Sequence, residues 1–227
     1  MHKRKYRVAL IGCGCIGAAH MDDIHDKTDI TVECVCDTNE QRARDFYAKY
    51  HACRYETDWK RVVSSESVDI VIIATYPSSH LEIVEECIKH GKHAICEKPI
   101  AADIENGERF VRLVKENPQC KILVGHILRH HKTYQKVAQM IQSGAIGKPI
   151  IMRMAQNHHT MDWQKYLRLI CETSPIIDCG VHYLDVMRWF TGSEIADISG
   201  IGLKTETDVP DGKYFFSRFF GIFHCST

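Results

Sequence analysis

The sequence predicts an α/β protein in which a doubly wound parallel sheet precedes the beginning of an α+β domain. Short apolar runs alternate with helix-permissive runs over the first 124 residues, as in a parallel sheet whose strands are connected by helices. The run VDIVIIAT at 68–75 is apolar on both faces, which is typical of a strand buried between two layers of helices. From residue 127 the alternation changes. We therefore divide the chain into domains at 1–124 and 125–227.

The elements of the first domain follow one another in order. Residues 6–11, YRVALI, form the first strand, and GCGCIG separates it from AAHMDDIHD, which can form a helix. The β-branched run ITVECVC at 30–36 is the second strand and ends at Asp37. The other predicted elements of this domain are helices at 39–50, 80–91 and 105–117 and strands at 68–75, 92–99 and 121–126.

The second domain has a less regular pattern. We predict a helix over 132–143, a half-buried strand over 150–159, a helix from Ser174-Pro175 to about Phe190, and a strand over ADISGIGLKTE. The end of the chain, KYFFSRFFGIFHCST, is rich in phenylalanine, and its ordinary interpretation is an aromatic edge strand. These elements together are expected to form the start of an α+β domain.

Composition excludes several classes of protein. Lys plus Arg and Asp plus Glu number 29 each, so nothing in the net charge suggests a nucleic-acid partner. No run approaches the ~20 apolar residues of a membrane span, and the short N-terminal apolar run does not resemble a secretory signal, so we expect a cytoplasmic protein. The eleven cysteines form no C-x-x-C pair, so we expect reduced, mostly buried thiols and no metal site.

The glycine-rich turn is the first candidate functional motif. Gly12, Gly14 and Gly17 follow a predicted strand and open a predicted helix, which is the spacing that lets backbone N–H groups approach a pyrophosphate. Asp37 lies 20 residues after Gly17 and would accept hydrogen bonds from an adenosine ribose while repelling a 2′-phosphate. The motif therefore predicts an NAD site, with NADP less favoured. The alternative is a turn that happens to contain several glycines. Two further residues of the turn are assigned to cofactor binding: Cys15 and Ile16.

The predicted helix at 176–189 carries the second motif. Asp178, His182 and Asp185 are spaced i, i+4 and i+7, so they share one helix face. A carboxylate beside a histidine can hold the ring tautomer while the other ring nitrogen faces a substrate. The alternative is a solvated face with an ordinary surface histidine. A separate apolar stripe is the expected core contact: Val181, Leu184 and Met187.

Taken in order, these motifs and four others resemble the glucose–fructose oxidoreductase, inositol dehydrogenase and rhizopine-catabolism (Gfo/Idh/MocA) family of NAD(P)-dependent oxidoreductases. The matching stretches are IGCGCIG, Asp37, ATYPSSH, CEKP, VGHILRH, GAIGKPI and DCGVH. The resemblance spans most of residues 6–200. It implies a Rossmann domain followed by an open-sheet substrate and dimerisation domain, so the full-length form is expected to be a homo-oligomer.

The resemblance also implies roles for individual residues. Thr75 and His80 are placed near the cofactor, and Glu97 and Lys98 beside the nicotinamide. Lys98 would sit at the carboxyl end of a strand, and its bond to Pro99 is a candidate cis peptide. Substrate-binding residues are expected to be Lys98, Arg129, His158, Asp178 and His182, of which the catalytic ones are Lys98, Asp178 and His182.

The leading functional hypothesis is a dehydrogenase that moves a hydride between NAD(H) and a secondary alcohol or ketone of a sugar, an inositol or a related polyol. His182 would be the general base, and Lys98 would stabilise the alkoxide. The alternative is a catalytically inactive, NAD-linked binding or regulatory protein on the same fold. Members of this family have a larger second domain. We therefore interpret the chain as C-terminally truncated, and we expect weak or absent activity and an exposed apolar surface.

Overall fold

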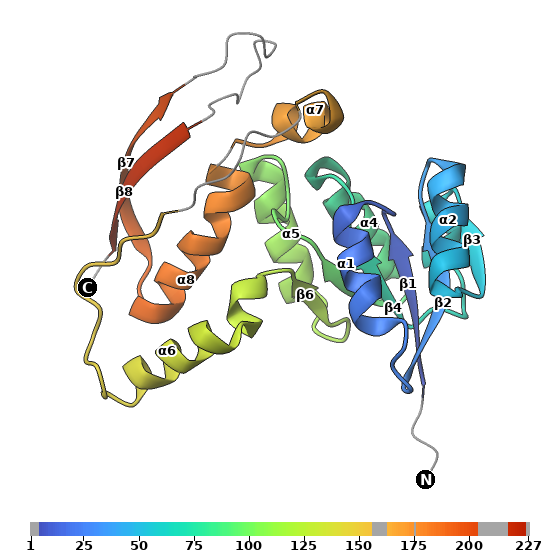
Figure 1. Cartoon of the computed structure of the whole chain (residues 1–227), viewed down its shortest axis with the longest axis horizontal. Helices are drawn as coiled ribbons and strands as arrows, with labels where there is room; N and C mark the ends of the chain where they lie inside the picture. The colour runs from blue at the N-terminus through green and yellow to red at the C-terminus, as the bar shows by residue number, and fades with distance from the viewer. Residues whose placement is uncertain (1–4, 156–162, 175, 204–217, 226–227) are drawn as a thin grey trace. The chain divides into compact units, whose positions relative to one another are not determined.

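The computed structural model describes residues 5–155, 163–174, 176–203 and 218–225 (Figure 1). The chain separates into two compact units, Met1–Gly125 and His126–Thr227, and each is described here by itself. Within the described residues, no helix combines the length and apolar character needed to cross a membrane.

The first unit contains a six-stranded sheet in the order β3-β2-β1-β4-β5-β6, and every neighbouring pair is parallel. This confirms the predicted doubly wound sheet. The strands are β1 (Tyr6–Ile11), β2 (Ile30–Cys36), β3 (Arg54–Glu56), β4 (Ile70–Ile73), β5 (His93–Cys96) and β6 (Ile122–Val124). The connecting helices are α1 (Cys15–Ile24), α2 (Glu40–Tyr50), α3 (Trp59–Val63), α4 (Pro77–Lys89) and α5 (Ile104–Glu116).

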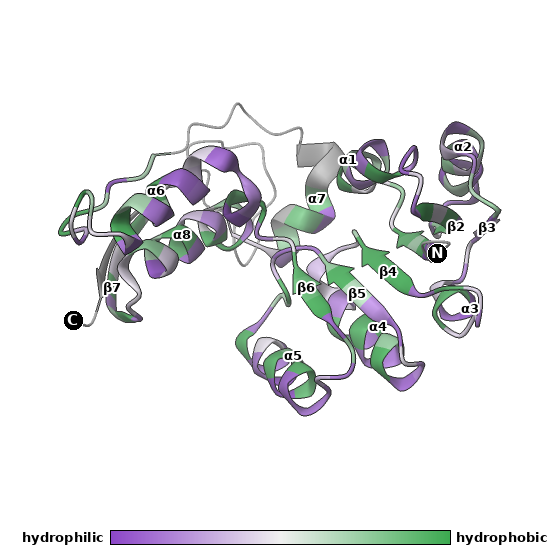
Figure 2. Cartoon of the chain, turned by 90° about the horizontal axis from the view of Figure 1, so that it is seen from below, coloured by the Kyte–Doolittle hydropathy of each residue, from purple (hydrophilic) through white to green (hydrophobic). Residues whose placement is uncertain are grey.

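Alternate residues of the strands bury opposite faces of this sheet. Ala9 and Ile11 of β1 belong to a core cluster shared with α3, α4 and α5, whereas Val8 and Leu10 belong to a second cluster shared with α1 and α2. Figure 2 shows the apolar strands β4 to β6 with α4 and α5 alongside them. Both faces are therefore covered by helices, which is why these strands read as continuous apolar runs.

Three details of the first unit differ from the prediction. The strand β3 and the short helix α3 were not predicted, because three- and five-residue elements are too short to show a period. Helix α4 begins at Pro77, three residues before the predicted start, since proline is favoured at the first helical position. The strand predicted at 68–75 is only Ile70–Ile73, although the N–H groups of Asp69 and Ala74 still donate to the backbone of β1.

The second unit contains helices and a two-stranded antiparallel sheet. Its helical segments are η1 (Ile127–His130), α6 (Lys132–Gln142), α7 (Trp163–Glu172), η2 (Ile176–Gly180) and α8 (Val181–Thr191). Strand β7 (Ile195–Leu203) pairs with β8 (Arg218–Cys225), so the aromatic end of the chain does form a strand. Helix α7 was not predicted.

The strand predicted over 150–159 is wrong for residues 150–155, which are irregular, and residues 156–159 lie outside the described part. Burial does alternate over part of the segment, because Met152 and Met154 are half-buried while Ile151, Arg153 and Ala155 are exposed. None of the described strands of this unit pairs with the segment, however, and without a partner an alternating stretch does not become a strand.

The predicted helix over 174–190 is divided in the structure. Residues Ile176–Gly180 form a π-helical turn, and α8 continues from Val181 until Gly192, which has the left-handed conformation of a C-terminal stop. The expected apolar stripe is only half-buried. The buried residues of α8 are instead Asp185 and Val186, because an ion pair brings Asp185 inward.

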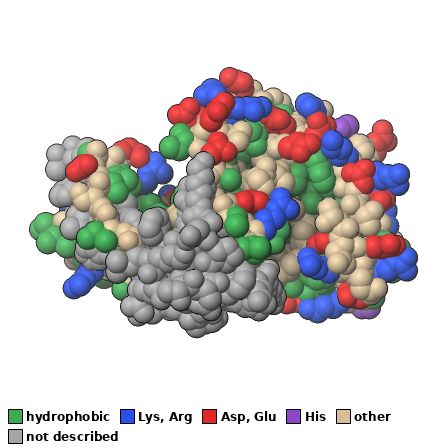
Figure 3. Space-filling model, turned by 90° about the horizontal axis from the view of Figure 1, so that it is seen from above, with side chains coloured by type: hydrophobic (Ala, Val, Ile, Leu, Met, Phe, Trp, Pro, Cys, Tyr) green, Lys and Arg blue, Asp and Glu red, His purple; other side chains and the backbone are tan. Residues whose placement is uncertain are grey.

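On the face that Figure 3 shows, charged side chains of both signs are interspersed.

Candidate functional site

The register of the parallel sheet brings several candidate residues to one edge. The last residues of four central strands, Cys36, Ile11, Ile73 and Cys96, are direct partners across the sheet. The next residue along each chain segment therefore lies at the carboxyl edge: Asp37, Gly12, Ala74 and Glu97. Ligands of open α/β sheets bind at this edge, near the point where the strand order reverses, which here lies between β1 and β4.

Two glycines of the turn after β1 are required by the packing of the protein itself. Gly12 has a φ of +103°, and a Cβ there would lie 2.3 Å from the carbonyl oxygen of Ala74. A Cβ on Gly17 would lie 2.1 Å from the carbonyl oxygen of Gly12. Both contacts are far inside van der Waals distance and involve backbone. Any larger residue would therefore force the turn away from the neighbouring strand.

Gly14 has no such internal reason. A Cβ there would meet nothing within 4 Å, and its φ of −97° is open to any residue. Gly14 is also the N-cap of α1 and makes no side-chain capping bond, so the N–H groups of the first turn are not capped by its side chain. Open space at the start of a helix fits the close approach of a pyrophosphate.

Asp37 is held at the edge by two backbone groups. Its carboxylate accepts hydrogen bonds from the N–H of Cys13 at 3.0 Å and from the N–H of Asn39 at 2.8 Å. The first bond ties the end of β2 to the glycine turn. The carboxylate is half-buried, so it keeps accessible surface for ribose hydroxyls. The residues present therefore fit the adenosine half of NAD.

His80 is fully buried and joins two backbone segments of the edge. Its ring nitrogens lie 2.9 Å from the carbonyl oxygen of Pro99 and 3.1 Å from that of Thr75. The bond between Lys98 and Pro99 is cis, as the sequence suggested. Because His80 has no exposed surface, it can serve a cofactor site by holding these two turns. Direct contact would come from Thr75, whose hydroxyl lies 2.8 Å from that of Ser79.

Glu97 lies in a small buried cluster. One carboxylate oxygen is 2.8 Å from Nε2 of His20, and the other accepts a hydrogen bond from the N–H of Lys98 at 3.3 Å. A Cβ on Gly125 would lie 2.8 Å from the same carboxylate, so the glycine leaves room for it. Burial by itself would raise the pKa of Glu97, but the His20 bond and the Lys98 group outweigh burial and hold that pKa below its usual value.

The second unit contains a polar cluster between η1 and α8. Arg129 donates two hydrogen bonds to Asp185, at 2.7 and 2.8 Å, and its guanidinium lies 5.4 Å from the ring centroid of Trp189. The Nδ1 atom of His126 is 3.9 Å from Asp185. The ring of His126 also meets that of His182 edge to face at 6.4 Å between centroids. His126, which lies just after β6, is therefore a neighbour of His182.

Sequence reasoning missed His20 and His126. His20 could have been found, because it lies three residues after Gly17 and therefore on the first helix of the dinucleotide motif. His126 had no local signal, since its partners lie more than fifty residues later. Asp178 lies in the π-helical turn η2 and His182 in α8, so the regular helical spacing on which the shared face was predicted is interrupted between them, whereas His158 lies outside the described residues.

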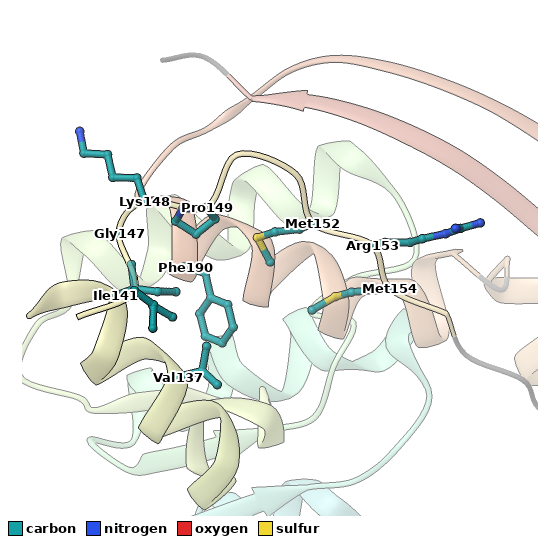
Figure 4. Close-up of a pocket in the computed structure, with 10 residues that line it drawn as sticks. Val137, Ile141, Gly147, Lys148, Pro149, Met152, Arg153, Met154 and Phe190 are labelled. Atoms are coloured by element: carbon teal, nitrogen blue, oxygen red, sulfur yellow. The ribbon is translucent and has the colours of Figure 1, made fainter. Parts of the chain in front are cut away.

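The second unit also contains a cavity, shown in Figure 4, whose lining does not include Arg129, Asp185 or His182. It measures about 290 Å3 and is lined mainly by apolar side chains of α6, of α8 and of the segment after Ile146. Among the described residues of this unit, Arg129, Asp178 and His182 are not part of its lining. Among the described residues, no group of three or more His, Cys, Asp or Glu side chains could hold a metal ion.

Several cysteine thiols are buried beneath the site. Burial is the main reason why the pKa of Cys13 is raised to about 12, and burial likewise raises the pKa of Cys36. Both thiols are therefore protonated at neutral pH and serve as packing groups.

Two family models match the chain. Residues 6–126 match the model described as "Oxidoreductase family, NAD-binding Rossmann fold", and residues 134–220 match the "GFO/IDH/MocA C-terminal domain". Inositol 2-dehydrogenase 4 of Saccharopolyspora erythraea is 28% identical over 213 residues, which are 93% of this chain and 62% of that protein. Myo-inositol 2-dehydrogenase of Thermotoga maritima is 24% identical over 86% of this chain and 58% of its own length. The chain thus spans less than two thirds of these relatives.

Solved structures have the same fold. A probable dehydrogenase from Thermotoga maritima superposes with a TM-score of 0.80 at 23% identity, over 89% of this chain and 60% of that one. Scyllo-inositol dehydrogenase from Lactobacillus casei, solved with bound NAD(H) and scyllo-inositol, gives a TM-score of 0.77 at 23% identity, over 88% of this chain and 60% of that one.

Proposed function

Because the chain belongs to the oxidoreductase family with the NAD-binding Rossmann fold, we propose that it carries the cofactor domain and the first part of the substrate domain of a polyol dehydrogenase. The reaction would exchange a hydride between NAD(H) and a secondary alcohol or ketone of an inositol, a sugar or a related polyol. The observation that carries this proposal is the open space over Gly14 at the start of α1, beside the carboxylate of Asp37.

The residues of the first unit would hold the cofactor. The N–H groups at the start of α1, at Cys15 and Ile16, would bind the pyrophosphate, and Asp37 would bind the adenosine ribose. Asp37 favours NAD over NADP, since its carboxylate would repel a 2′-phosphate. Thr75 and Glu97 lie at the carboxyl ends of β4 and β5, on the opposite side of β1 from Asp37, and would border the nicotinamide half. Bound NAD supplies the hydride acceptor.

The proton of the reacting hydroxyl would pass to this chain's own base. In the oxidation direction, Nε2 of His182 would take the proton of the hydroxyl group. The carbon that bears this hydroxyl would at the same time lose its hydride. The ammonium group of Lys98 stabilises the negative charge that develops on the oxygen. Asp178, one helical turn before His182, would orient the substrate or the imidazole. Arg129 is assigned to the support of α8 through Asp185 instead of direct substrate contact.

The relatives that the chain matches carry dehydrogenase names, so they give no support to the alternative of an inactive regulatory protein. A panel of inositols, sugars and other polyols, each mixed with NAD, tests the proposal by the absorbance of the NADH formed. We expect oxidation of at least one polyol by a version of the protein that spans the full length of the relatives, and weak or absent oxidation by this chain. In the longer version, Lys98→Ala and His182→Ala should each lower turnover by roughly 10²-fold or more, at nearly unchanged NAD affinity. If that longer version bound NAD but oxidised no polyol, the proposed activity would be contradicted.

A further inference from the structure

We propose that His20 is a positioning residue for the nicotinamide half of the cofactor, which it serves by holding Glu97 and thereby the turn that carries Lys98. This inference rests on the proposed function, because it assumes that NAD binds at the carboxyl edge of the sheet. His20 lies on α1, whose first turn faces the pyrophosphate position. It would thus connect the helix that binds the phosphates to the turn that borders the reacting ring.

The contacts of Glu97 explain why a single histidine could have this effect. The glutamate side chain is only 10% exposed, and its carboxylate is held from two sides, by Nε2 of His20 and by the N–H of Lys98. The backbone N–H of Glu97 donates to the carbonyl oxygen of Ile73, which anchors it to β4. Its carboxylate is thereby fixed beside the Lys98 turn, and it is hydrogen-bonded to His20 on α1.

Space around this carboxylate is limited. Gly125, which follows β6, lies so close that a Cβ there would approach the carboxylate oxygens to 2.8 and 2.9 Å. The rotamer that reaches His20 is therefore accommodated by a residue without a side chain. A buried carboxylate that loses one hydrogen-bond donor must find another or become protonated, and either change would shift the turn that carries Lys98.

Sheet topology places this cluster at the nicotinamide half. A dinucleotide lies across the switch point of a doubly wound sheet, with its pyrophosphate at the turn after the first strand. Asp37 is on the β2 side of that turn, so the adenosine ribose lies there. The nicotinamide half of the dinucleotide must therefore extend over the carboxyl ends of β4 and β5, where Thr75 and Glu97 are located. His20 reaches this half while its helix contacts the phosphates.

The test compares two nucleotides that differ in the nicotinamide. ADP-ribose contains the adenosine, the pyrophosphate and a second ribose, but no nicotinamide ring, whereas NADH contains all of them. Affinities for both are measured by titration calorimetry on the full chain, with His20→Leu, which removes the donor, and His20→Gln, which offers an amide N–H to Glu97 without a charge. Asp37→Ala is the control for the adenosine half and should weaken both nucleotides.

We expect His20→Leu to weaken NADH by about tenfold, in line with the loss of a hydrogen bond to a charged group. ADP-ribose should change by no more than about twofold, since it lacks the nicotinamide ring that this cluster is proposed to position. His20→Gln should restore most of the NADH affinity. In the double variant with Glu97→Gln, the two losses should not add, because Glu97→Gln removes the charge of the acceptor in the same bond that His20→Leu breaks.

Three results would overturn the inference: equal losses for both nucleotides, a His20→Gln variant as weak as His20→Leu, or additive losses in the double variant. Equal losses of affinity for both nucleotides would mean that His20 only stabilises α1. A variant that still binds ADP-ribose is folded, so its weaker binding of NADH would not be due to unfolding. If the unaltered chain bound neither nucleotide, the proposed cofactor site would itself be refuted, and this inference with it. If the unaltered chain bound both nucleotides and any of the three results were found, only the role of His20 would be refuted, and the proposed cofactor site would stand.

Discussion

Two glycines of the same turn should respond in opposite ways to an added methyl group. Gly14→Ala places a Cβ where nothing lies within 4 Å, at a φ of −97° that alanine adopts readily. Because Gly14 caps α1 without a side-chain bond, the expected cost is only the preference for glycine over alanine at this position, at most about 1 kcal/mol. The same methyl group would occupy the space in which we place the pyrophosphate, so nucleotide affinity should decrease strongly.

Gly12→Ala should instead destabilise the fold. Its Cβ would lie 2.3 Å from the carbonyl oxygen of Ala74, and its φ of +103° is unfavourable for alanine. The left-handed conformation costs about 1–2 kcal/mol and overpacking typically about 1–3 kcal/mol, so the free energy of unfolding should decrease by about 2–5 kcal/mol. The clash is with backbone, which cannot move without disturbing the end of β4.

Both variants are measured by urea unfolding and by titration with NADH. We expect Gly14→Ala to unfold at nearly the same urea concentration as the unaltered chain and to bind NADH at least about tenfold more weakly, a difference of about 1.4 kcal/mol. Gly12→Ala should unfold at a clearly lower concentration. If Gly14→Ala bound NADH normally, the pyrophosphate would not lie at the start of α1, and the reasoning from open space would be refuted.

The remaining predictions concern three charged groups. Asp37→Ala should narrow the preference for NAD over NADP, and equal affinity of the unaltered chain for both cofactors in calorimetry would contradict the assigned role. The pKa of Glu97 is lower in the folded chain than its usual 4.5, so its ionised form stabilises the fold above that pH, and the contribution is lost as pH falls through the folded pKa. The unaltered chain should therefore lose stability more steeply than Glu97→Gln below about pH 4.5 in urea titrations, and parallel curves would exclude this linkage. Arg129→Leu should lower the free energy of unfolding by about 1–3 kcal/mol, because it leaves the buried Asp185 without its bidentate partner. Arg188→Leu, which breaks the exposed pair between α8 and Glu194, should cost less than about 1 kcal/mol. Equal costs in thermal unfolding would show that burial of the pair does not matter.

Local patterns predicted the first unit well. The run YRVALI at 6–11 and the run ITVECVC at 30–36 match the observed strands residue for residue, because both are bounded by residues that interrupt a strand. The glycine spacing predicted a turn between strand and helix, and the internal contacts of Gly12 and Gly17 account for two of its three glycines. These features depend on neighbours along the chain, so they are visible in sequence.

Prediction was weaker in the second unit. Residues 150–155 alternate in polarity but have no partner strand among the described elements, and a ladder cannot be deduced from one strand. The face of α8 was also misjudged, since the burial of Asp185 depends on Arg129, which lies 56 residues earlier. An ion pair over that distance leaves no periodic signal.

The sequence by itself determined the longer strands and helices of the first unit, the glycine turn that we propose for the pyrophosphate, and the proposal of Asp37 as the ribose acceptor, because each follows from spacing along the chain. Only the tertiary structure decided which polar groups meet. The parallel register sets Glu97 at the same edge as Asp37, and the packing of α1 on the sheet brings His20 to Glu97 across 77 residues of sequence. The physical reason is that hydrogen bonds between side chains depend on distances in space, which are fixed only after the strands have paired and the helices have covered them.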